Sequence, residues 1–509
     1  MSELENPKSR NESLLTEILN DGGEYEAPKS RNEKIMVKIL GGDIEIEQPK
    51  SRIEKLLIAI KEKIDSMGGG GGAVPEKDVN FYDMDASLVA SYTAEEFAAL
   101  SEMPANPEHE GLIAEGWNYT LEEAKTYVSK YGGLDIGQFY KTDDGTTRIH
   151  INLTEGYKNI TCAFVVREGT ASIDWGDGSP KTTDIPASSG HSFKYSDHEY
   201  SSAGDYVIKI SGKIELAAHG SVGCYLITTK STTESYCRIA TSTIKKVEVG
   251  ENATFYYPVF SGARNLEILT IPKEVKLTTG LSQFFNSCYS LKALTLPDFD
   301  ESISNKTTEN MISDACNLER LSLPKNTTTI GYFGATNGSK LSSLAIPQGV
   351  TTISGSLTFK NSLKKLYIPD TVTTISANQM LQSNKAMKKL VIPDSVTTCN
   401  DTIVVSCEIL REIKLSKNCT TALRLQGCAG IDYYEIPANV ESVGSCANAY
   451  SLAIIKCLPT TPPTLSANAF SGAYKLEKIY VPDESVDAYK AASNWSTYAS
   501  KIFGLSELA

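Results

Sequence analysis

Leu341-Ser-Ser-Leu-Ala-Ile-Pro347 is one copy of a short motif, LxxLxLP, that decides the fold of the C-terminal half of this chain. The motif returns as Leu363-Lys-Lys-Leu-Tyr-Ile-Pro369 and as Met387-Lys-Lys-Leu-Val-Ile-Pro393. Other copies span 291–297, 318–324 and 476–482, and variants span 266–272, 410–416 and 431–437. Two degenerate copies end at Gly250 and Pro459, so successive motif ends lie roughly 21 to 27 residues apart.

The chemistry of the motif predicts one short strand per repeat. Its last two apolar positions alternate across a polar residue, as a strand with one buried face requires. The proline then ends the strand, because it has no N–H to donate to a neighbour. A single unit cannot bury its own apolar face, but stacked units bury a continuous core. The period therefore predicts a leucine-rich-repeat solenoid over residues 244–509, with a C-terminal cap.

Length and composition limit the rest of the chain. A length of 509 residues is too great for one core and predicts several domains. A net charge of −13 without a basic stripe argues against nucleic-acid binding. We predict no signal peptide, because residues 1–7 lack a basic start followed by an apolar run, and no membrane insertion, because no stretch approaches the ~20 apolar residues of a span.

The eleven cysteines are odd in number, form no CxxC pair and are mostly scattered through the repeats. This pattern argues against a zinc site and against a disulfide framework. We interpret the cysteines as small buried apolar residues in a protein made in a reducing cytoplasm.

A second repeat, with a step of 21 residues, occupies residues 1–67: Pro7-Lys-Ser-Arg returns at Pro28 and at Pro49. Proline suits the first turn of a helix, and the apolar residues that follow lie on one helical face. Such a short segment buries little by itself, so these faces are expected to dock on copies of themselves or on a larger assembly; a small helical domain is the alternative. Residues 68–77, with five consecutive glycines, form a flexible linker. The interface residues expected in this anchor are Leu14, Leu15, Ile18, Ile35, Ile39, Leu56, Leu57 and Ile60.

Between linker and solenoid we predict two modules and a connector. Residues 78–151 form a small α+β spacer: a strand near Val79, helices capped by Thr93 and Thr120, a loop over 111–118 and a hairpin over 138–151. Residues 152–212 alternate like strands and form a β-sandwich, and residues 213–243 lead into the solenoid. The fold class is therefore multidomain and mainly β, with α+β parts.

Three resemblances to known families follow from these residues. Residues 152–212, with the turn Trp175-Gly-Asp-Gly178 and the later His198 and Tyr200, resemble a PKD-type β-sandwich. The repeats resemble the BspA-like leucine-rich repeats of bacteria, a class used for surface adhesion, most closely in the final unit around 458–495. The N-terminal PKSR repeats and residues 79–137 resemble tail-fibre proteins of phages and prophages, in which such modules precede variable C-terminal binding domains.

The residues do not predict an active site, a cofactor or a bound metal. The five histidines all lie before the repeats, which excludes a nucleophile–base pair or a histidine-rich metal cluster inside the solenoid. His198 is expected to pack in the sandwich, and Asp177 to form a turn rather than to bind calcium. A carboxylate pair for sugar cleavage leaves no spacing signal; the acids that could supply one are Asp298, Asp300, Glu301, Asp314, Asp370, Asp394 and Asp401, which we expect to be turn residues.

These observations predict a non-enzymatic phage tail-fibre or receptor-binding protein. The N-terminus would attach to tail, baseplate or other virion proteins, the chain would form a homotrimer, and the solenoid would bind a host-surface glycan or protein. Its location would be an exposed part of a virion or tail-like particle, after synthesis in the bacterial cytoplasm. The alternatives are a bacterial cell-surface adhesin and, third, a glycan-degrading tailspike. The expected receptor-binding residues are Tyr289, Tyr332, Tyr367, Tyr433, Tyr450 and Tyr474.

Overall fold

The computed structural model divides the chain into two compact units, residues 1–76 and residues 77–509. The structure describes residues 77–217, 227–228, 242–256, 259–312, 317–333, 339–357, 359 and 361–508. The anchor predicted over 1–67, with its eight apolar interface residues, lies outside the described residues, as does nearly all of the linker. No described helix is long and apolar enough to span a bilayer.

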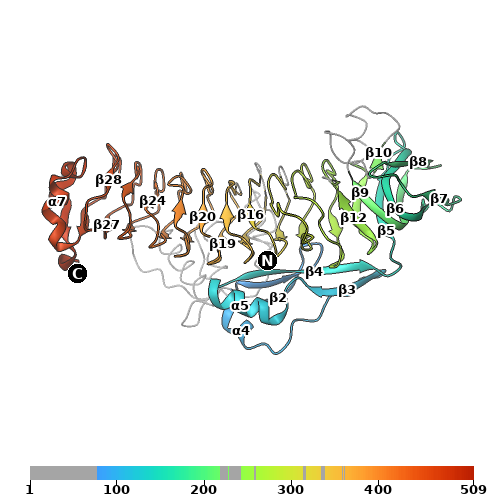
Figure 1. The fold of residues 1–509 in the computed structure, drawn as a ribbon, viewed down its shortest axis with the longest axis horizontal. Helices are drawn as coiled ribbons and strands as arrows, with labels where there is room; N and C mark the ends of the chain where they lie inside the picture. The colour runs from blue at the N-terminus through green and yellow to red at the C-terminus, as the bar shows by residue number, and fades with distance from the viewer. Residues whose placement is uncertain are drawn as a thin grey trace, which may run out of the picture. The chain divides into compact units, whose positions relative to one another are not determined.

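Residues 77–142 form a small α+β module (Figure 1). Its sheet has the order β2-β1-β4-β3, in which β1 and β4 are parallel. Thr93 and Thr120 cap the two helices through the predicted capping boxes, and Phe81, Phe97 and Trp117 pack in the core. The loop expected over 111–118 is instead mostly strand β3, whose Trp117 reaches the core. The elements are β1 Val79–Tyr82, β2 Leu88–Tyr92, α4 Ala94–Ala98, β3 Leu112–Trp117, α5 Leu121–Tyr131 and β4 Leu134–Thr142.

The next strands build one sheet that continues into the solenoid. The order is β10-β6-β9-β5-β11-β13, with β7 and β8 on β6 and β12 on β9. The hairpin predicted over 138–151 is therefore wrong: β4 pairs in the module, whereas β5 pairs with β9 and β11. The boundary predicted between residues 151 and 152 lies inside β5. The elements are β5 Thr147–Leu153, β6 Asn159–Asp174, β7 Thr182–Pro186, β8 Lys194–Glu199, β9 Gly204–Ala217, β10 Ile227–Thr228, β11 Ile244–Glu248, β12 Ala253–Tyr256 and β13 Ile268–Thr270.

An aromatic cluster stabilises the turn that follows β6. The ring of His198 stacks on Trp175, with centroids 4.6 Å apart, and its Nε2 lies 2.8 Å from Asp177 Oδ2. Tyr200 is buried and donates its hydroxyl to the Trp175 carbonyl. His198 thus has the packing role expected from the sequence, and Asp177 accepts from Ser179 N as a turn residue does.

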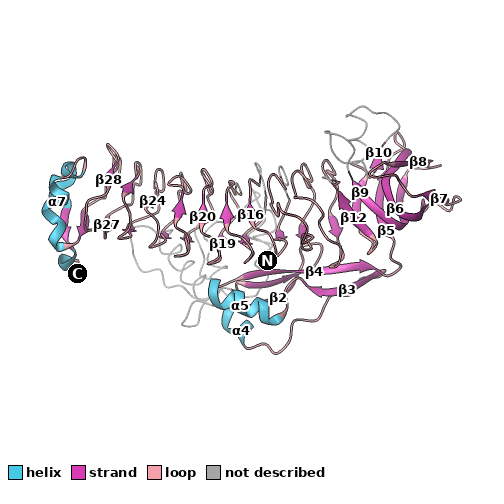
Figure 2. Cartoon of the chain, in the orientation of Figure 1, coloured by secondary structure: helices cyan, strands magenta, loops and turns pink. Residues whose placement is uncertain are grey.

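From β13 onward, every described LxxLxLP motif forms a short parallel strand, and these strands line one face of the solenoid, called here the motif face. Figure 2 shows the strands repeating along the solenoid, with helices confined to the module and the C-terminal end of the described chain. The strands after β13 are β14 Ala293–Thr295, β15 Arg320–Ser322, β17 Ser343–Ala345, β19 Lys365–Tyr367, β21 Lys389–Val391, β23 Glu412–Lys414, β25 Tyr433–Ile436, β27 Ile454–Cys457 and β29 Lys478–Val481.

From β16 to β28 the turns also carry a second strand of two residues, which the LxxLxLP motif does not predict. Thr329, Thr352, Thr374 and Thr398 pair in register across four turns. The threonine before each donates its hydroxyl to the preceding turn, as Thr373 does to the Thr351 carbonyl at 3.4 Å. This threonine face is built from β16 Thr329–Ile330, β18 Thr352–Ile353, β20 Thr374–Ile375, β22 Thr398–Cys399, β24 Thr421–Ala422, β26 Ser442–Val443 and β28 Thr464–Leu465.

Several buried cysteines occupy the repeat position three residues before the first apolar residue of the motif, where they donate a hydrogen bond to the preceding turn. Cys407 donates its thiol to the Leu381 carbonyl at 3.0 Å, and Cys428 donates to Val404 at 2.9 Å, in each case across one turn. Asn384, at the same position, donates to the preceding turn through its side-chain amide. A small buried donor therefore satisfies a carbonyl inside the core. The eight described cysteines are free, and seven of them are buried, as predicted.

Both ends of the solenoid are closed by structure outside the repeat. At the first, β5 pairs with β11; at the last, β30 pairs with β29. The buried Trp495 donates its indole N–H to the Pro463 carbonyl at 2.7 Å, which holds the cap on the final turn. The cap comprises η2 Asp483–Ser485, α7 Val486–Ala491, η3 Trp495–Lys501, β30 Ile502–Gly504 and η4 Leu505–Glu507.

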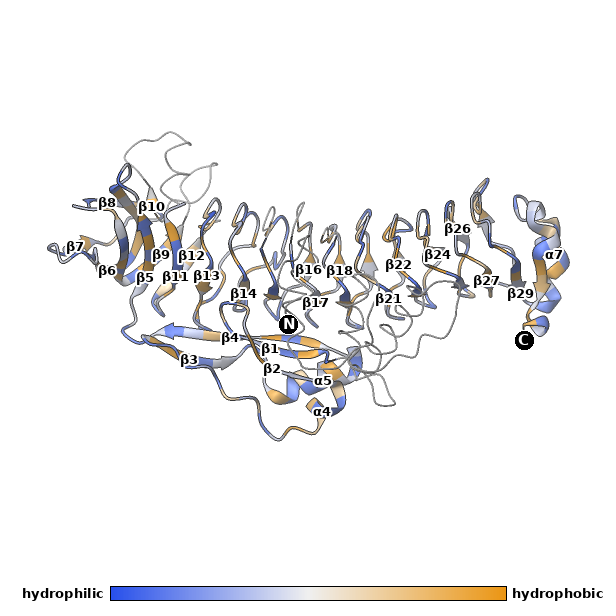
Figure 3. Cartoon of the chain, turned by 180° about the vertical axis from the view of Figure 1, so that it is seen from behind, coloured by the Kyte–Doolittle hydropathy of each residue, from blue (hydrophilic) through white to orange (hydrophobic). Residues whose placement is uncertain are grey.

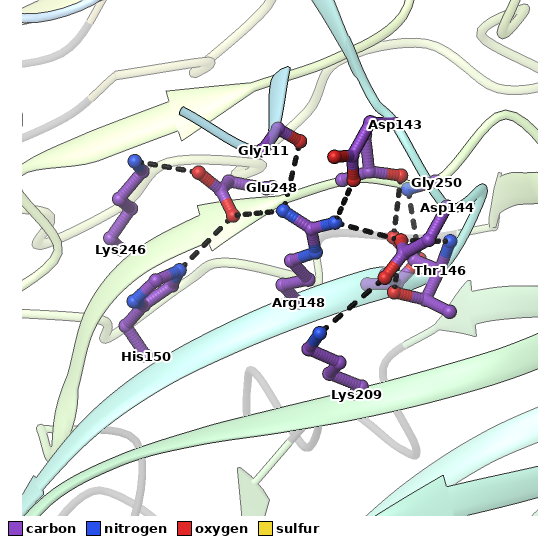
Figure 4. Close-up of polar contacts among 12 residues, drawn as sticks. Gly111, Asp143, Asp144, Thr146, Arg148, His150, Lys209, Lys246, Glu248 and Gly250 are labelled. Carbon is purple, nitrogen blue, oxygen red and sulfur yellow. Dashed lines mark hydrogen bonds and ion pairs between the residues drawn. The ribbon is translucent and has the colours of Figure 1, made fainter. Parts of the chain in front are cut away.

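Arg148 on β5 joins the module, the sheet and the first solenoid strand (Figure 4). Its guanidinium donates to the Gly111 carbonyl at 2.9 Å and pairs with Asp143 and, at 2.9 Å, with Asp144. Glu248 on β11 lies 3.9 Å away on the other side. Residues from three parts of the chain thus share one side chain, so this junction fixes their relative placement within residues 77–508.

Candidate binding surface

The α+β module lies against the motif face of the solenoid, where β4 contacts β13, β14, β15 and β17 (Figure 1). The approach is close because two glycines face the solenoid. A Cβ at Gly137 would lie 2.0 Å from Thr295 Oγ1, and a Cβ at Gly133 would lie 2.3 Å from the Tyr367 hydroxyl. Only a backbone without side chains fits at these two positions.

Polar groups fix the register of this contact. Tyr127 on α5 is buried and donates its hydroxyl to the Ile346 carbonyl at 2.8 Å. Asp135 on β4 is also buried; it accepts from Asn80 at 3.0 Å and from Ser343 on β17. Burial raises the pKa of Asp135, and these hydrogen bonds oppose that shift without cancelling it.

Ionic and aromatic contacts extend the covered area toward β19. The Arg320 guanidinium lies 3.9 Å from the centre of the Tyr82 ring, a cation–π geometry. Lys325 pairs with Glu123 at 3.0 Å, and Tyr131 donates its hydroxyl to Asp370. The module therefore covers the motif face from β13 to β19, and nothing else can bind there while it is docked.

Beyond β19 no other described part of the chain covers the motif face, and outward side chains reach solvent. Val391 and Tyr433 are 38% and 40% exposed, whereas inward residues such as Leu390 are buried. Lys389 pairs with Glu412 at 2.6 Å and Lys456 with Glu435 at 3.1 Å across neighbouring strands. Figure 3 shows hydrophilic and hydrophobic residues alternating along these turns. We call the exposed part of β21–β29 and the turns before these strands the open surface.

Two of the predicted receptor-binding residues form a stacked pair on the open surface. The rings of Tyr450 and Tyr474 are 6.1 Å apart and within 8° of parallel, and their side chains are 48% and 84% exposed. Both occupy the position two residues before the first leucine of the motif, in successive turns. Tyr433 lies one turn earlier and donates its hydroxyl to Glu435; burial and this carboxylate raise its pKa to about 12.

The other three predicted tyrosines lie elsewhere. Tyr367 packs against the module core and is part of the covered interface. Tyr289 is half-buried beneath the Arg264 guanidinium, 5.6 Å from its ring centre. Tyr332 is half-buried near the gap in the described chain at 334–338. Tyr450 and Tyr474 are therefore brought together, and Tyr433 is exposed on β25 of the preceding repeat, whereas Tyr289, Tyr332 and Tyr367 are at least partly covered.

Of the seven acids considered for sugar cleavage, Asp314 lies outside the described residues, and the other six contact backbone or side-chain donors. Asp298 accepts from Lys325 N at 2.7 Å, and Asp394 accepts from Lys417 N at 3.1 Å, one turn on. Asp300 accepts from Ser302 in a tight turn, and Asp401 pairs with Arg424. These contacts are those of turn residues. Among the described residues, no group of three His, Cys, Asp or Glu side chains is placed to hold a metal ion.

A model of the BspA type leucine-rich repeat region matches residues 233–332, 254–386, 309–425 and 423–502. Together these matches run from 233 to 502, which is 270 of 509 residues and more than half of the chain. The chain belongs to the BspA-type leucine-rich repeat family. No curated protein gives a significant match.

Several crystal structures of leucine-rich repeat proteins are similar to this BspA-type chain. One from Bacteroides ovatus is 19% identical, with 52% of this chain and 82% of that chain covered and a TM-score of 0.26. A leucine rich cell surface protein from Faecalibacterium prausnitzii is 18% identical, with 52% and 81% covered and a TM-score of 0.28. One from Eubacterium ventriosum is 18% identical, with 54% and 86% covered and a TM-score of 0.30.

Proposed function

We propose that this protein is a non-enzymatic recognition protein that binds a ligand on a cell envelope through the open surface of its solenoid. The observation that carries this proposal is the stacked, exposed pair Tyr450–Tyr474 in the turns before β27 and β29, on the open surface that the module leaves uncovered. Exposed aromatic rings held in a fixed geometry lose little entropy on binding, and tyrosine is enriched at binding hot spots. Repeat solenoids also use extended faces of this kind for binding.

The test uses the full chain, labelled and adsorbed to intact bacterial cells. The double variant Tyr450→Ala/Tyr474→Ala is expected to bind at least tenfold more weakly, because loss of a hot-spot ring costs roughly 1.4 kcal/mol or more. Tyr289→Ala is the matched control, since Tyr289 occupies the same repeat position but lies half-buried under Arg264. Equal adsorption by the double variant and the wild type would refute the open surface as the binding site.

We further propose that the chain serves as a phage tail fibre or as part of a tail-like particle, with residues 1–67 attached to tail or virion proteins. The resemblance of the PKSR repeats and of residues 79–137 to tail-fibre proteins supports this role. A homotrimer is expected, because the apolar faces that the sequence predicts for the N-terminal repeats would need partners. Light scattering of the full chain should give three times the mass of one chain, and a monomeric mass would contradict the assembly.

A bacterial surface adhesin is the second candidate, favoured by membership in the BspA-type family. Mass spectrometry separates the two: a fibre is recovered with induced, purified particles, whereas an adhesin is released when proteases act on intact producing cells. A glycan-degrading tailspike is disfavoured by the solenoid acids, which hold turns and ion pairs. Release of reducing ends from cell-wall glycans by the purified chain would reverse that conclusion.

A further inference from the structure

Three cations stand in a row just before β19, β21 and β23, where the covered part of the motif face gives way to the open surface. Lys364, Lys388 and Arg411 each follow the first apolar residue of the motif, in three consecutive repeats. All three side chains are exposed. In the described chain none of them has an ion-pair partner, although the chain as a whole carries a net charge of −13.

In earlier turns of the solenoid, the charged residues at this repeat position form ion pairs. Glu267 and Lys292 occupy it in two successive turns and pair with each other at 3.7 Å. Glu319 occupies it in the next turn and pairs with Lys340 at 3.2 Å. Opposite charges therefore compensate one another along this column before the row begins.

The acidic residues near the row either pair with other cations or lie at a different repeat position, except for Asp432 at its end. Glu412 pairs with Lys389 at 2.6 Å and Asp394 pairs with Lys417 at 3.0 Å. The exposed Glu408 lies two residues before the motif, at the position that Lys385 holds one turn earlier. Asp432 occupies the same repeat position as the three cations in the next repeat, so the row of cations ends at Arg411.

Like charges in such a row repel one another. Strands of a sheet lie about 4.8 Å apart, and two unit charges 4 Å apart interact by about 1 kcal/mol even in bulk water. In the described chain no acid pairs with Lys364 or Lys388, and Asp432 neighbours Arg411 only at the end of the row. A row of uncompensated cations with the spacing of the turns is complementary to a linear polymer that carries regularly spaced negative charges.

The position of the row favours a glycan over other polyanions. Tyr433 is in the repeat after that of Arg411, and the stacked Tyr450 and Tyr474 precede the motifs of the next two repeats, so the tyrosines follow the row along the solenoid. Sugar rings present apolar faces that stack on tyrosine, whereas a polyol-phosphate chain has no ring to stack. A nucleic acid would need a broader basic face than one row of three side chains.

We propose that the row formed by Lys364, Lys388 and Arg411 binds a linear acidic polysaccharide that runs along the solenoid, with one carboxylate near each cation and its sugar rings continuing onto Tyr433 and the Tyr450–Tyr474 pair. The inference rests on the proposed function, because it names the class of ligand that the open surface takes. It adds three binding residues that the aromatic pattern alone does not indicate.

The test measures binding of the full chain to polygalacturonate and to its methyl ester, which has the same sugar backbone without the charge. The wild type is expected to bind the acid at least tenfold more tightly, with an affinity that falls as salt is added. The double variant Lys388→Gln/Arg411→Gln should lose this preference. Lys292→Gln/Lys340→Gln, which removes the same net charge from two paired cations, should keep it, and thermal unfolding of all variants checks their folding.

Three outcomes would overturn the proposal. The first is equal binding of the acid and its ester by the wild type. The second is equal loss of binding in both double variants, and the third is tighter binding of poly(glycerol phosphate) than of polygalacturonate. Cell adsorption separates this failure from failure of the proposed function: if the Tyr450→Ala/Tyr474→Ala variant loses adsorption while Lys388→Gln/Arg411→Gln retains it, the row alone is refuted.

Discussion

The two halves of the motif face have the same repeat and opposite roles. From β14 to β17 the outward positions include Ala293, Thr295, Ser322, Ser343 and Ala345, and the module rests on them. From β21 to β29 the outward positions include lysine, valine, glutamate and tyrosine, and these side chains reach solvent. The inward residues build the same core in both halves. Small outward residues thus let β4 approach closely at the centre of the covered half, whereas the larger Arg320 and Tyr367 contact the module through their side chains.

The largest expected effect comes from breaking the covered half. Gly137→Ala would place a Cβ 2.0 Å from Oγ1 and 3.0 Å from Cβ of Thr295, so either the Thr295 side chain or one backbone must move. We expect a loss of about 2 to 3 kcal/mol in the free energy of unfolding, the upper range for an overpacked site, measured by urea unfolding. Gly156→Ala, where nothing lies within 4 Å, should change it by less than about 0.5 kcal/mol. If Thr295→Gly does not partly rescue Gly137→Ala, the contact described here is wrong.

A smaller effect is expected from the pH dependence of the same interface. Burial raises the pKa of Asp135 in the folded state, so the folded protein binds this proton more tightly than the unfolded chain. The contribution of Asp135 is therefore most favourable below its unfolded pKa of about 3.9 and is lost as pH rises through the folded pKa. Asp135→Asn, which can still accept from Ser343, should flatten this decline when urea midpoints are compared from pH 4 upward.

Asp394 on the open half provides the control of opposite sign. Hydrogen bonds from the backbone and side chain of Lys417 lower the pKa of Asp394. Its contribution is present above the unfolded pKa and is lost as pH falls through the folded pKa. Asp394→Asn should therefore alter the acid side of the profile; identical pH profiles for the two variants and the wild type would contradict both assignments.

The smallest expected effect on stability belongs to the open half itself. Tyr450→Ala/Tyr474→Ala removes two rings that are 48% and 84% exposed, so the free energy of unfolding should change by no more than about 1 kcal/mol. Tyr434→Ala, beside Tyr433 but fully buried, should cost about 3 to 5 kcal/mol in the same assay. Comparable losses for both variants would mean that the stacked pair stabilises the fold instead of serving recognition.

The sequence predicted those features that depend on local pattern. Alternation and a terminal proline were sufficient to predict the motif strands, and the Thr93 and Thr120 boxes were sufficient for the helix starts. The threonine strands were missed because a pair such as Thr374–Ile375 is too short to show a period. The docking of the module was missed because it joins residues such as Tyr127 and Ile346, which are 219 positions apart.

The candidate site was predicted in part, for related reasons. Tyrosine content identified Tyr433, Tyr450 and Tyr474, but the same criterion selected Tyr367, which is covered by the module. Gly132 takes the left-handed conformation that ends α5, a local role typical of glycine after a helix. Gly133 also allows a close approach to Tyr367. This contact depends on long-range packing, so it could not be predicted from a local sequence pattern.

The sealed ends of the solenoid have a consequence for how this protein can diversify. β5 pairs with the first motif strand, β11, and β30 pairs with the last, β29. The edges of the repeat array are therefore covered by strands outside the repeat. One whole turn could be duplicated or lost near β21–β25 without leaving an unpaired edge strand that promotes aggregation. Each such event would shift the stacked tyrosines by one turn relative to the docked module, and so lengthen or shorten the stretch of polymer that the surface can span.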